Sequence, residues 1–155
     1  MNTDMKLKIN STSSNSTEKI GEQIGSKLKG GEFIELASDL GGGKTTFTRG
    51  LARGAGSQDV VSSPTFTISN VYMGKKFTIN HFDFYRLSQP GLISNELAEL
   101  INDKNQVTIV EWAGVVENVL LKDRLVVEIL YSSENSRIIN ISFAYKLKYL
   151  VAGLK

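Results

Sequence analysis

The chain has 155 residues, of which 41% are apolar and 22% are charged, a composition typical of one folded domain with a buried core. It has no cysteine and a single histidine, His81, which excludes disulfides, thiol catalysis and metal sites built from cysteines or several histidines. Its 18 basic and 16 acidic residues nearly balance, which argues against a dedicated nucleic-acid-binding protein.

The N-terminal segment is polar and leads into a helix. Because it lacks the apolar stretch of a signal peptide, and no apolar run approaches the roughly 18 residues of a membrane span, we expect a cytoplasmic protein without membrane contact. Residues 1–13 are expected to be partly flexible, and the polar run 10–17 to form a loop with Ser16 or Thr17 as the helix N-cap. The helix is predicted to end at glycines 30–31. Its apolar face recurs at every fourth position, at Ile20, Ile24 and Leu28.

The remaining elements follow from apolar periodicity and turn residues. Strands are predicted over residues 32–37, 65–73, 77–84, 107–112, 125–131 and 137–143, and helices over 46–55, 93–101 and 115–121. Turns at 74–76 and 132–136 join two pairs of strands into hairpins. The tail, 145–155, has apolar residues at helical spacing, which favours packing on its own sheet over docking on a partner. Helices between strands, with antiparallel strands added, predict an α/β fold with a mixed sheet.

The strongest local signal is a glycine-rich loop between a predicted strand and a predicted helix. Residues 41–46 read Gly-Gly-Gly-Lys-Thr-Thr. Small residues let backbone N–H groups turn toward phosphate oxygens, Lys44 supplies a positive charge, and the Thr45 hydroxyl is placed to ligate Mg²⁺. The first position of the usual phosphate-loop pattern is Ser38 instead of glycine. The order of strand, loop and helix favours a phosphate site over an ordinary glycine turn.

Two carboxylates at the ends of apolar strands could complete such a site. Asp83 ends one strand and Glu111 follows another, and ligands of open α/β sheets gather at the carboxyl ends of parallel strands. Either residue could instead be a solvated strand-end carboxylate, and the sequence does not decide which of them touches a metal. Trp112, the only tryptophan, either packs near the nucleotide or is an ordinary core aromatic. His81 is interpreted as a structural strand residue because it has no histidine or cysteine companion.

A segment after the phosphate-loop helix has the features of a switch. Ser63, Pro64 and Thr65 combine a stiff backbone position with two hydroxyls, and segments at this place in phosphate-loop proteins often sense the γ-phosphate. The alternative is a plain turn into the next strand.

Four motifs occur together in one order, and together they resemble a known family. They are residues 38–50, 63–66, 81–87 and 110–112. The chain is similar through them, over about residues 14–143, to the bacterial TsaE family, also called YjeE. That resemblance implies a P-loop NTPase-like three-layer fold in a single ATPase domain over 1–155, with ATP and Mg²⁺ as cofactors. It also implies a role in tRNA threonylcarbamoyladenosine modification.

The resemblance further implies partners. TsaD and TsaB transfer the threonylcarbamoyl group, and ATP turnover by the TsaE protein supports repeated rounds of that reaction. The tRNA would be reached indirectly through this complex, because the near-balanced charge leaves few cations to follow an RNA backbone. The sequence leaves open whether the lone chain is a monomer.

Carried over residue by residue, the resemblance assigns roles to the motifs. The phosphates would be held by Asp39, Leu40, Gly41, Gly42, Gly43, Lys44, Thr45 and Thr46. Thr45 and Glu111 would hold Mg²⁺, with Asp83 at or near the metal, and Lys44, Asp83 and Glu111 would be the catalytic set. Trp112 would lie by the site, Ser14 and Thr17 near the nucleotide base, and Ser63, Pro64 and Thr65 in the switch-like loop. The chain departs from the family pattern at Ser38, where glycine is usual, and at Ala113, where many members have proline.

Two other functions remain open from the sequence. A small-molecule or nucleotide kinase would need several cations over the transferred phosphoryl group, but between Tyr85 and Gln106 there are only Arg86 and Lys104. A nucleotide-dependent interaction module that does not hydrolyse ATP would carry the same loop, so only a measurement of turnover separates it from an ATPase.

Overall fold

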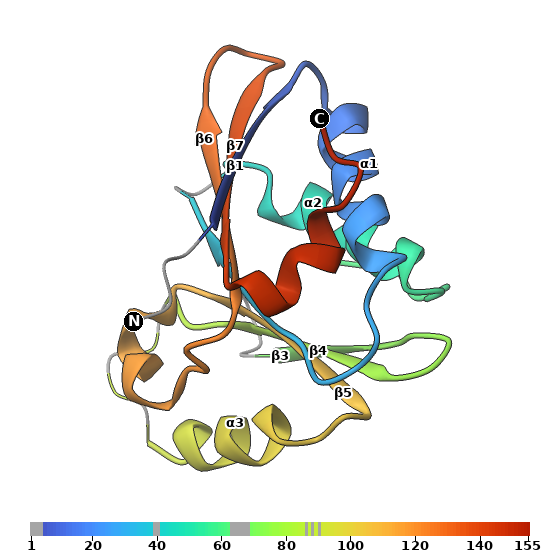
Figure 1. Ribbon diagram of the computed structural model, residues 1–155. Helices are drawn as coiled ribbons and strands as arrows, with labels where there is room; N and C mark the ends of the chain where they lie inside the picture. The colour runs from blue at the N-terminus through green and yellow to red at the C-terminus, as the bar shows by residue number, and fades with distance from the viewer. Residues whose placement is uncertain (1–4, 39–40, 63–68, 86, 88, 90) are drawn as a thin grey trace.

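The computed structural model describes residues 5–38, 41–62, 69–85, 87, 89 and 91–155 (Figure 1). Its elements in chain order are β1 (Met5–Ser11), α1 (Ser14–Gly25), β2 (Phe33–Ala37), α2 (Lys44–Gly54), β3 (Ser69–Met73), β4 (Thr78–Asp83), α3 (Ile93–Ile101), β5 (Gln106–Glu111), the 3-10 segment η1 (Ala113–Val119), β6 (Leu125–Tyr131), β7 (Arg137–Phe143) and the 3-10 segment η2 (Tyr145–Val151). Most of the predicted strands and helices are therefore present within a few residues of their expected bounds.

A mixed sheet forms the middle of the molecule. Its strand order is β1-β7-β6-β2-β5-β4-β3. The central strands β6, β2, β5 and β4 run parallel to their neighbours in that set, while β7, β1 and β3 are added antiparallel. The two predicted hairpins, β3–β4 and β6–β7, are confirmed by these pairings. The carboxyl ends of β2, β4, β5 and β6 therefore meet at one edge, where ligands bind in open α/β sheets.

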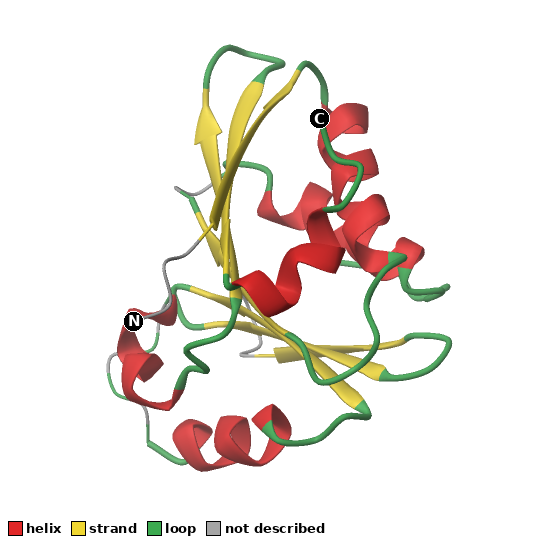
Figure 2. Cartoon of the chain, in the orientation of Figure 1, coloured by secondary structure: helices red, strands yellow, loops and turns green. Residues whose placement is uncertain are grey.

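Helical elements cover both faces of the sheet, as Figure 2 shows. On one face α1, α2 and η2 pack on a large apolar cluster that includes Ile24 and Phe47. On the other face α3 and η1 pack on a smaller cluster that includes Leu97 and Val116. Side chains alternate between the two clusters along β2, since Phe33 faces α3 and η1 whereas Ile34 faces α1 and α2. This sheet with helices on both faces confirms the predicted α/β class.

The helices α1 and α2 approach each other through glycines on both sides. A Cβ atom at Gly21 or Gly25 of α1 would collide with backbone carbonyl oxygens of α2, and one at Gly50 or Gly54 would collide with carbonyl oxygens of α1. Glycine in a helix costs about 0.5–1 kcal/mol relative to alanine. Glycine at all four facing positions is therefore explained by the close contact between the two helices and not by helix propensity.

We therefore expect Gly50→Ala to destabilise the protein by about 3 kcal/mol, because the new methyl group would overlap the carbonyl oxygen of Glu18 and force the two helices apart. Urea unfolding of the purified variant measures this change. The matched control is Gly114→Ala, because a Cβ there has nothing within 4 Å. Equal stability of the two variants would contradict the close-contact interpretation.

The structure corrects the prediction for the N-terminal region. Residues expected to form a loop include the end of β1, which pairs antiparallel with β7 over its whole length. The N-cap of α1 is Ser13, whose side chain accepts a hydrogen bond from Ser16 N at 3.0 Å, so the predicted cap at Ser16 or Thr17 is wrong. Thr17 lies inside the helix, buried, with its Oγ1 2.6 Å from Ser11 Oγ. The helix ends at Gly25 and not at the glycine pair.

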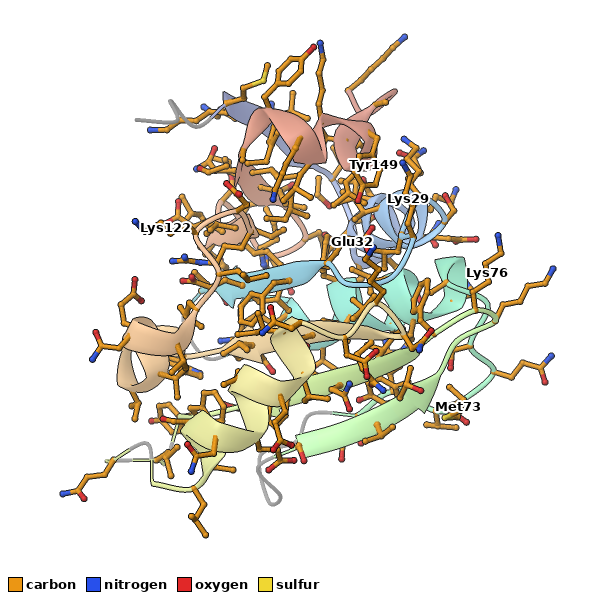
Figure 3. All side chains as sticks on the ribbon, turned by 60° about the horizontal axis from the view of Figure 1, so that its bottom comes forward. Lys29, Glu32, Met73, Lys76, Lys122 and Tyr149 are labelled. Atoms are coloured by element: carbon orange, nitrogen blue, oxygen red, sulfur yellow. The ribbon has the colours of Figure 1, made fainter. Side chains whose placement is uncertain are left out.

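The C-terminal tail packs on its own protein. Leu147, Leu150, Val151 and Leu154 are all buried in the larger apolar cluster. Tyr149 anchors the tail further, because its Oη donates to Glu32 Oε2 at 2.6 Å, and Lys29 Nζ lies 4.1 Å from the Tyr149 ring centroid (Figure 3). The prediction that the tail covers its own sheet is thus confirmed. Within the described ranges, no helix is long and apolar enough to span a membrane.

The Tyr149–Glu32 contact makes a pH-dependent contribution to stability. Burial, and then the hydrogen bond and charge of Glu32, raise the pKa of Tyr149 well above its ordinary value of 10.0. A raised folded-state pKa gives stability that is complete below about pH 10 and is lost as the pH rises toward the folded-state value.

We expect the stability difference between the wild type and Tyr149→Phe to be largest below pH 10 and to shrink above it. Urea unfolding at several pH values measures it, with the exposed Tyr145→Phe as control. A difference that stays constant across this range would contradict the assignment.

Candidate functional site

The glycine-rich loop leads directly into α2. Gly41 and Gly43 have φ values of 76° and 109°, a backbone region that side-chain-bearing residues avoid, so glycine is required there by conformation. Gly43 is the N-cap of α2, and Lys44 is its first residue. The unpaired N–H groups of this first turn carry partial positive charge and suit an anion. Asp39 and Leu40 of the predicted phosphate site lie outside the described residues.

Lys44 is buried and held by three groups. Its Nζ donates to Ser38 O at 3.1 Å, lies 3.8 Å from Glu111 Oε1 and sits 4.6 Å from the centroid of the Trp112 ring. The structure thus brings together three of the predicted site residues, from α2, the end of β5 and the residue after it. A buried ammonium group needs such partners, because an unpaired charge in the interior is strongly unfavourable.

The two predicted carboxylates lie side by side. Asp83 and Glu111 are opposite each other at the ends of the parallel neighbours β4 and β5. Asp83 Oδ1 accepts a hydrogen bond from Tyr85 N at 2.9 Å. Burial raises the pKa of Asp83 above its ordinary value of 3.8, and the nearby negative charge of Glu111 adds to the increase. A partly buried carboxylate whose ionised form is disfavoured, with a second carboxylate beside it, is typical of a site that receives a cation.

Trp112 adopts a strained backbone conformation. Its φ of 56° makes it the only non-glycine residue with positive φ in the described part of the chain. Such a conformation costs roughly 1–2 kcal/mol for a residue with a side chain and is found mostly at functional sites. It turns the chain directly after Glu111 and places the indole over Lys44, with the Tyr85 ring centroid 5.0 Å away. Trp112 also lines a cavity of about 380 Å³ beside Ser38 and the end of β2.

His81 belongs to this cluster, although the sequence alone suggested a structural role. Its Nε2 lies 2.7 Å from Glu111 Oε2, and its side chain is completely buried. The signal for this contact was present in the sequence. Residues two apart on a strand share a face, so His81 lies on the same side of β4 as Asp83. What the sequence could not give was the pairing of β4 with β5, which brings both residues next to Glu111.

A small cavity adjoins the glycine-rich loop on the other side from the carboxylates' strands. Its volume is about 160 Å³. It is lined by Ser14, Thr17, Gly41, Gly43, Thr46, Glu134, Asn135 and Arg137. Ser14 and Thr17, predicted to lie near the nucleotide base, are therefore next to the loop.

Nothing in the sequence indicated three further residues that line this cavity, namely Glu134 and Asn135 of the β6–β7 turn and Arg137, the first residue of β7. Arg137 Nε donates to Gly42 O at 3.2 Å, while its Nη1 donates to the carbonyls of Ser133 and Ser136 at 2.9 Å each. Arg137 thereby fixes the turn against the glycine-rich loop.

The site offers oxygen ligands suited to a magnesium ion that arrives with phosphates. Among the residues with described positions, no group of three or more histidine or carboxylate side chains could hold a metal by itself. Mg²⁺ is usually bound through one or two carboxylates, water and substrate phosphates, so a full protein cage is not expected. Glu111, Asp83 and the hydroxyl of Thr45, which follows Lys44 in the first turn of α2, fit that pattern. The predicted switch residues Ser63, Pro64 and Thr65 lie outside the described positions.

Comparison with known proteins identifies the family. The sequence model of the "Threonylcarbamoyl adenosine biosynthesis protein TsaE" family matches residues 11–139. The chain belongs to the TsaE family. The tRNA threonylcarbamoyladenosine biosynthesis protein TsaE of Bacillus subtilis is 34% identical over 134 residues, covering 85% of this chain and 82% of that protein. The TsaE protein of Streptomyces coelicolor is 40% identical over 111 residues, covering 69% and 74%. The resemblance drawn from the four motifs is confirmed.

A solved protein structure has the same fold. The crystal structure of YdiB from Bacillus subtilis superposes with a TM-score of 0.78 at 29% sequence identity, and the match covers 97% of this chain and 94% of that one. The predicted fold class is confirmed by this match and by the mixed sheet with helices on both faces.

The raised pKa of Asp83 predicts that this residue costs stability in the folded protein. A raised folded-state pKa means that the ionised carboxylate destabilises the fold above that pKa and has no such effect below about pH 4. We expect Asp83→Asn to stabilise the protein at pH 7 by up to about 1 kcal/mol, a modest gain because solvent screens a partly exposed group. The gain should vanish at pH 3.

Urea unfolding at both pH values measures this effect. Asp103→Asn is the matched control, because Asp103 Oδ1 accepts a hydrogen bond from Asn105 N at 2.8 Å in the same local arrangement, on an exposed turn. An Asp83→Asn protein that is less stable than the wild type at pH 7 would show that the ionised Asp83 carboxylate does not cost stability in the folded protein.

Proposed function

We propose that the chain is a Mg²⁺-dependent ATP-binding and ATP-hydrolysing protein that supports tRNA threonylcarbamoyladenosine modification. The observation that carries this proposal is the position of Lys44. It opens a helix after glycines of positive φ and lies within 4 Å of a buried carboxylate at the end of a neighbouring parallel strand. In a member of the TsaE family, this arrangement favours a nucleoside triphosphate as the ligand.

Each group has a distinct role in the proposed reaction. The N–H groups of the glycine-rich loop and of the first turn of α2 bind phosphate oxygens, and Lys44 exchanges its contacts with Ser38 O and Glu111 for the β- and γ-phosphates. Thr45 and Glu111 would hold Mg²⁺, which neutralises charge that builds up on the transferred phosphoryl group. Asp83, which stands beside Glu111, would orient the attacking water.

The nucleoside end of ATP would lie in or over the small cavity beside the loop. Ser14 and Thr17 bring hydroxyls, Asn135 brings an amide, and Arg137 brings a planar cation that can stack on a base. Arg137 already contacts Gly42 of the loop, so a nucleotide bound here would touch the phosphate-binding backbone and the β6–β7 turn together.

The partners proposed are TsaD and TsaB, with the tRNA reached through their complex. The chain's relatives are named for tRNA threonylcarbamoyladenosine biosynthesis, and the near-balance of 18 basic and 16 acidic residues favours contact with tRNA through other proteins. ATP turnover by this chain would then support repeated rounds of a transfer that the partners perform.

Reconstitution of tRNA modification with TsaD and TsaB tests the proposal. We expect product to accumulate over many turnovers only with this chain and ATP. Lys44→Ala should lower kcat/KM for ATP by about 100-fold, since the charge that stabilises the phosphates is gone. Lys76→Ala, which removes an exposed lysine at the β3–β4 turn, is the matched control and should behave as wild type (Figure 3).

Two results would count against this function. If the wild-type chain does not bind ATP, the loop is not a nucleotide site. If ATP binds but the multiple-turnover yield is the same with and without the chain, the role in modification is wrong. Modification that proceeds with bound ATP but without hydrolysis would instead favour the interaction module.

A further inference from the structure

His81 is buried beside the proposed metal site but has no part in the proposed reaction. It lies on β4, opposite Ile109 of β5 and two residues before the end of its strand. Its side chain has no exposed surface, and its Nε2 contacts Glu111 Oε2 at 2.7 Å. A carboxylate accepts hydrogen bonds, so Nε2 carries the proton and donates it. Hydrogen bonds of this length to a charged acceptor are among the stronger ones in proteins.

The two oxygens of Glu111 have different partners. Oε2 is held by His81, whereas Oε1 faces Lys44 Nζ at 3.8 Å. This separation fixes the plane of the carboxylate and turns one oxygen toward the glycine-rich loop. Without the bond from His81, the carboxylate could rotate and share both oxygens with Lys44, which would leave neither oriented for another ligand.

His81 is itself held in place from β3. The ring of Tyr72 packs against the imidazole with centroids 6.1 Å apart, and Tyr72 Oη is 3.5 Å from His81 Nδ1. Tyr72 Oη donates to Ser62 O at 3.0 Å, and Tyr72 is buried. Contacts thus run from Glu111 on β5 through His81 on β4 to Tyr72 on β3. These three strands are neighbours in the sheet (Figure 1).

We propose that His81 is a positioning residue for Glu111, and that Tyr72 supports it. His81 keeps Glu111 Oε1 directed toward Lys44 and available to the Mg²⁺ of a bound nucleotide. The inference rests on the proposed function, since it concerns how that site binds its metal. Groups that hydrogen-bond a metal-binding residue typically change metal affinity by 10–100-fold when they are removed.

The test compares two substitutions of His81 that differ in their hydrogen bonding. His81→Gln keeps an N–H donor near the position of Nε2, whereas His81→Leu keeps an apolar group of similar size and removes the donor. Each protein is bound to ADP, and Mg²⁺ is added while the fluorescence of Trp112, the only tryptophan, is followed. The ring centroid of Trp112 lies 4.6 Å from Lys44 Nζ, so it reports on this site.

We expect His81→Leu to raise the Mg²⁺ concentration at half-maximal signal by at least about 10-fold, with ADP affinity in the absence of metal changed by less than about 2-fold. His81→Gln should restore most of the wild-type Mg²⁺ dependence. A purely structural histidine predicts a different outcome, in which both variants lose thermal stability and neither changes the Mg²⁺ dependence.

Tyr72→Phe provides a second test that keeps the core intact. It retains the ring against His81 and removes only the hydroxyl, which donates to Ser62 O, accepts from Asn70 Nδ2 and lies 3.5 Å from His81 Nδ1. We expect a smaller increase in the Mg²⁺ requirement, about 2–5-fold. If His81→Leu does not fold, the test rests on Tyr72→Phe and His81→Gln. An unchanged Mg²⁺ dependence in Tyr72→Phe would then overturn the inference.

The outcome for the wild type separates this inference from the proposed function. If the wild type responds to Mg²⁺ and His81→Leu responds at the same concentration, only the positioning role is wrong. If the wild type binds ADP without any response to Mg²⁺, the metal-dependent function is wrong and the positioning role is rejected with it.

Discussion

The close, glycine-lined contact between α1 and α2 is the constraint on which the arrangement of the site depends. Gly21 of α1 faces Phe47 of α2, and Gly25 faces Leu51. The contacts thus follow the same order along both helices, so the two helices run parallel. Parallel packing brings both N-termini to one end, where Ser14 and the glycine-rich loop line the same cavity. Two helix N-termini with like partial charges repel each other, and an anion placed between them relieves that repulsion.

The contacts of Lys44 mean that phosphate binding at this site, as proposed, would be an exchange of partners. In the structure its charge is already satisfied by Ser38 O, Glu111 and the Trp112 ring. Bound phosphates would have to compete with those contacts, so the net gain on binding would be the difference between two well-satisfied states of one buried cation. The same exchange would release Glu111 Oε1 at the moment when a cation arrives with the nucleotide.

Local sequence signals were enough to predict the loop, most strands and the positions of Glu111 and Asp83, because each of these depends on a few neighbouring residues. Contacts between distant parts of the chain were not predictable. The strand β1 has a clear alternation of apolar and polar residues, but its partner β7 begins more than a hundred positions later, and Ser13 takes the cap only because β1 ends at Ser11. Arg137 reaches Gly42 for the same reason, through strand pairing that no local pattern encodes.

Three features that oppose stability or restrict the backbone occur together at one edge of the sheet. They are the positive φ of Gly41 and Gly43, the strained backbone of Trp112 and the raised pKa of Asp83. The same edge also carries charges of both signs. The glycine-rich loop and the helix N-termini favour an anion, whereas the carboxylates of Asp83 and Glu111 favour a cation. Inorganic phosphate would satisfy the first group and a free metal ion the second. A magnesium–nucleotide complex satisfies both, which is the physical reason to favour it over either component alone.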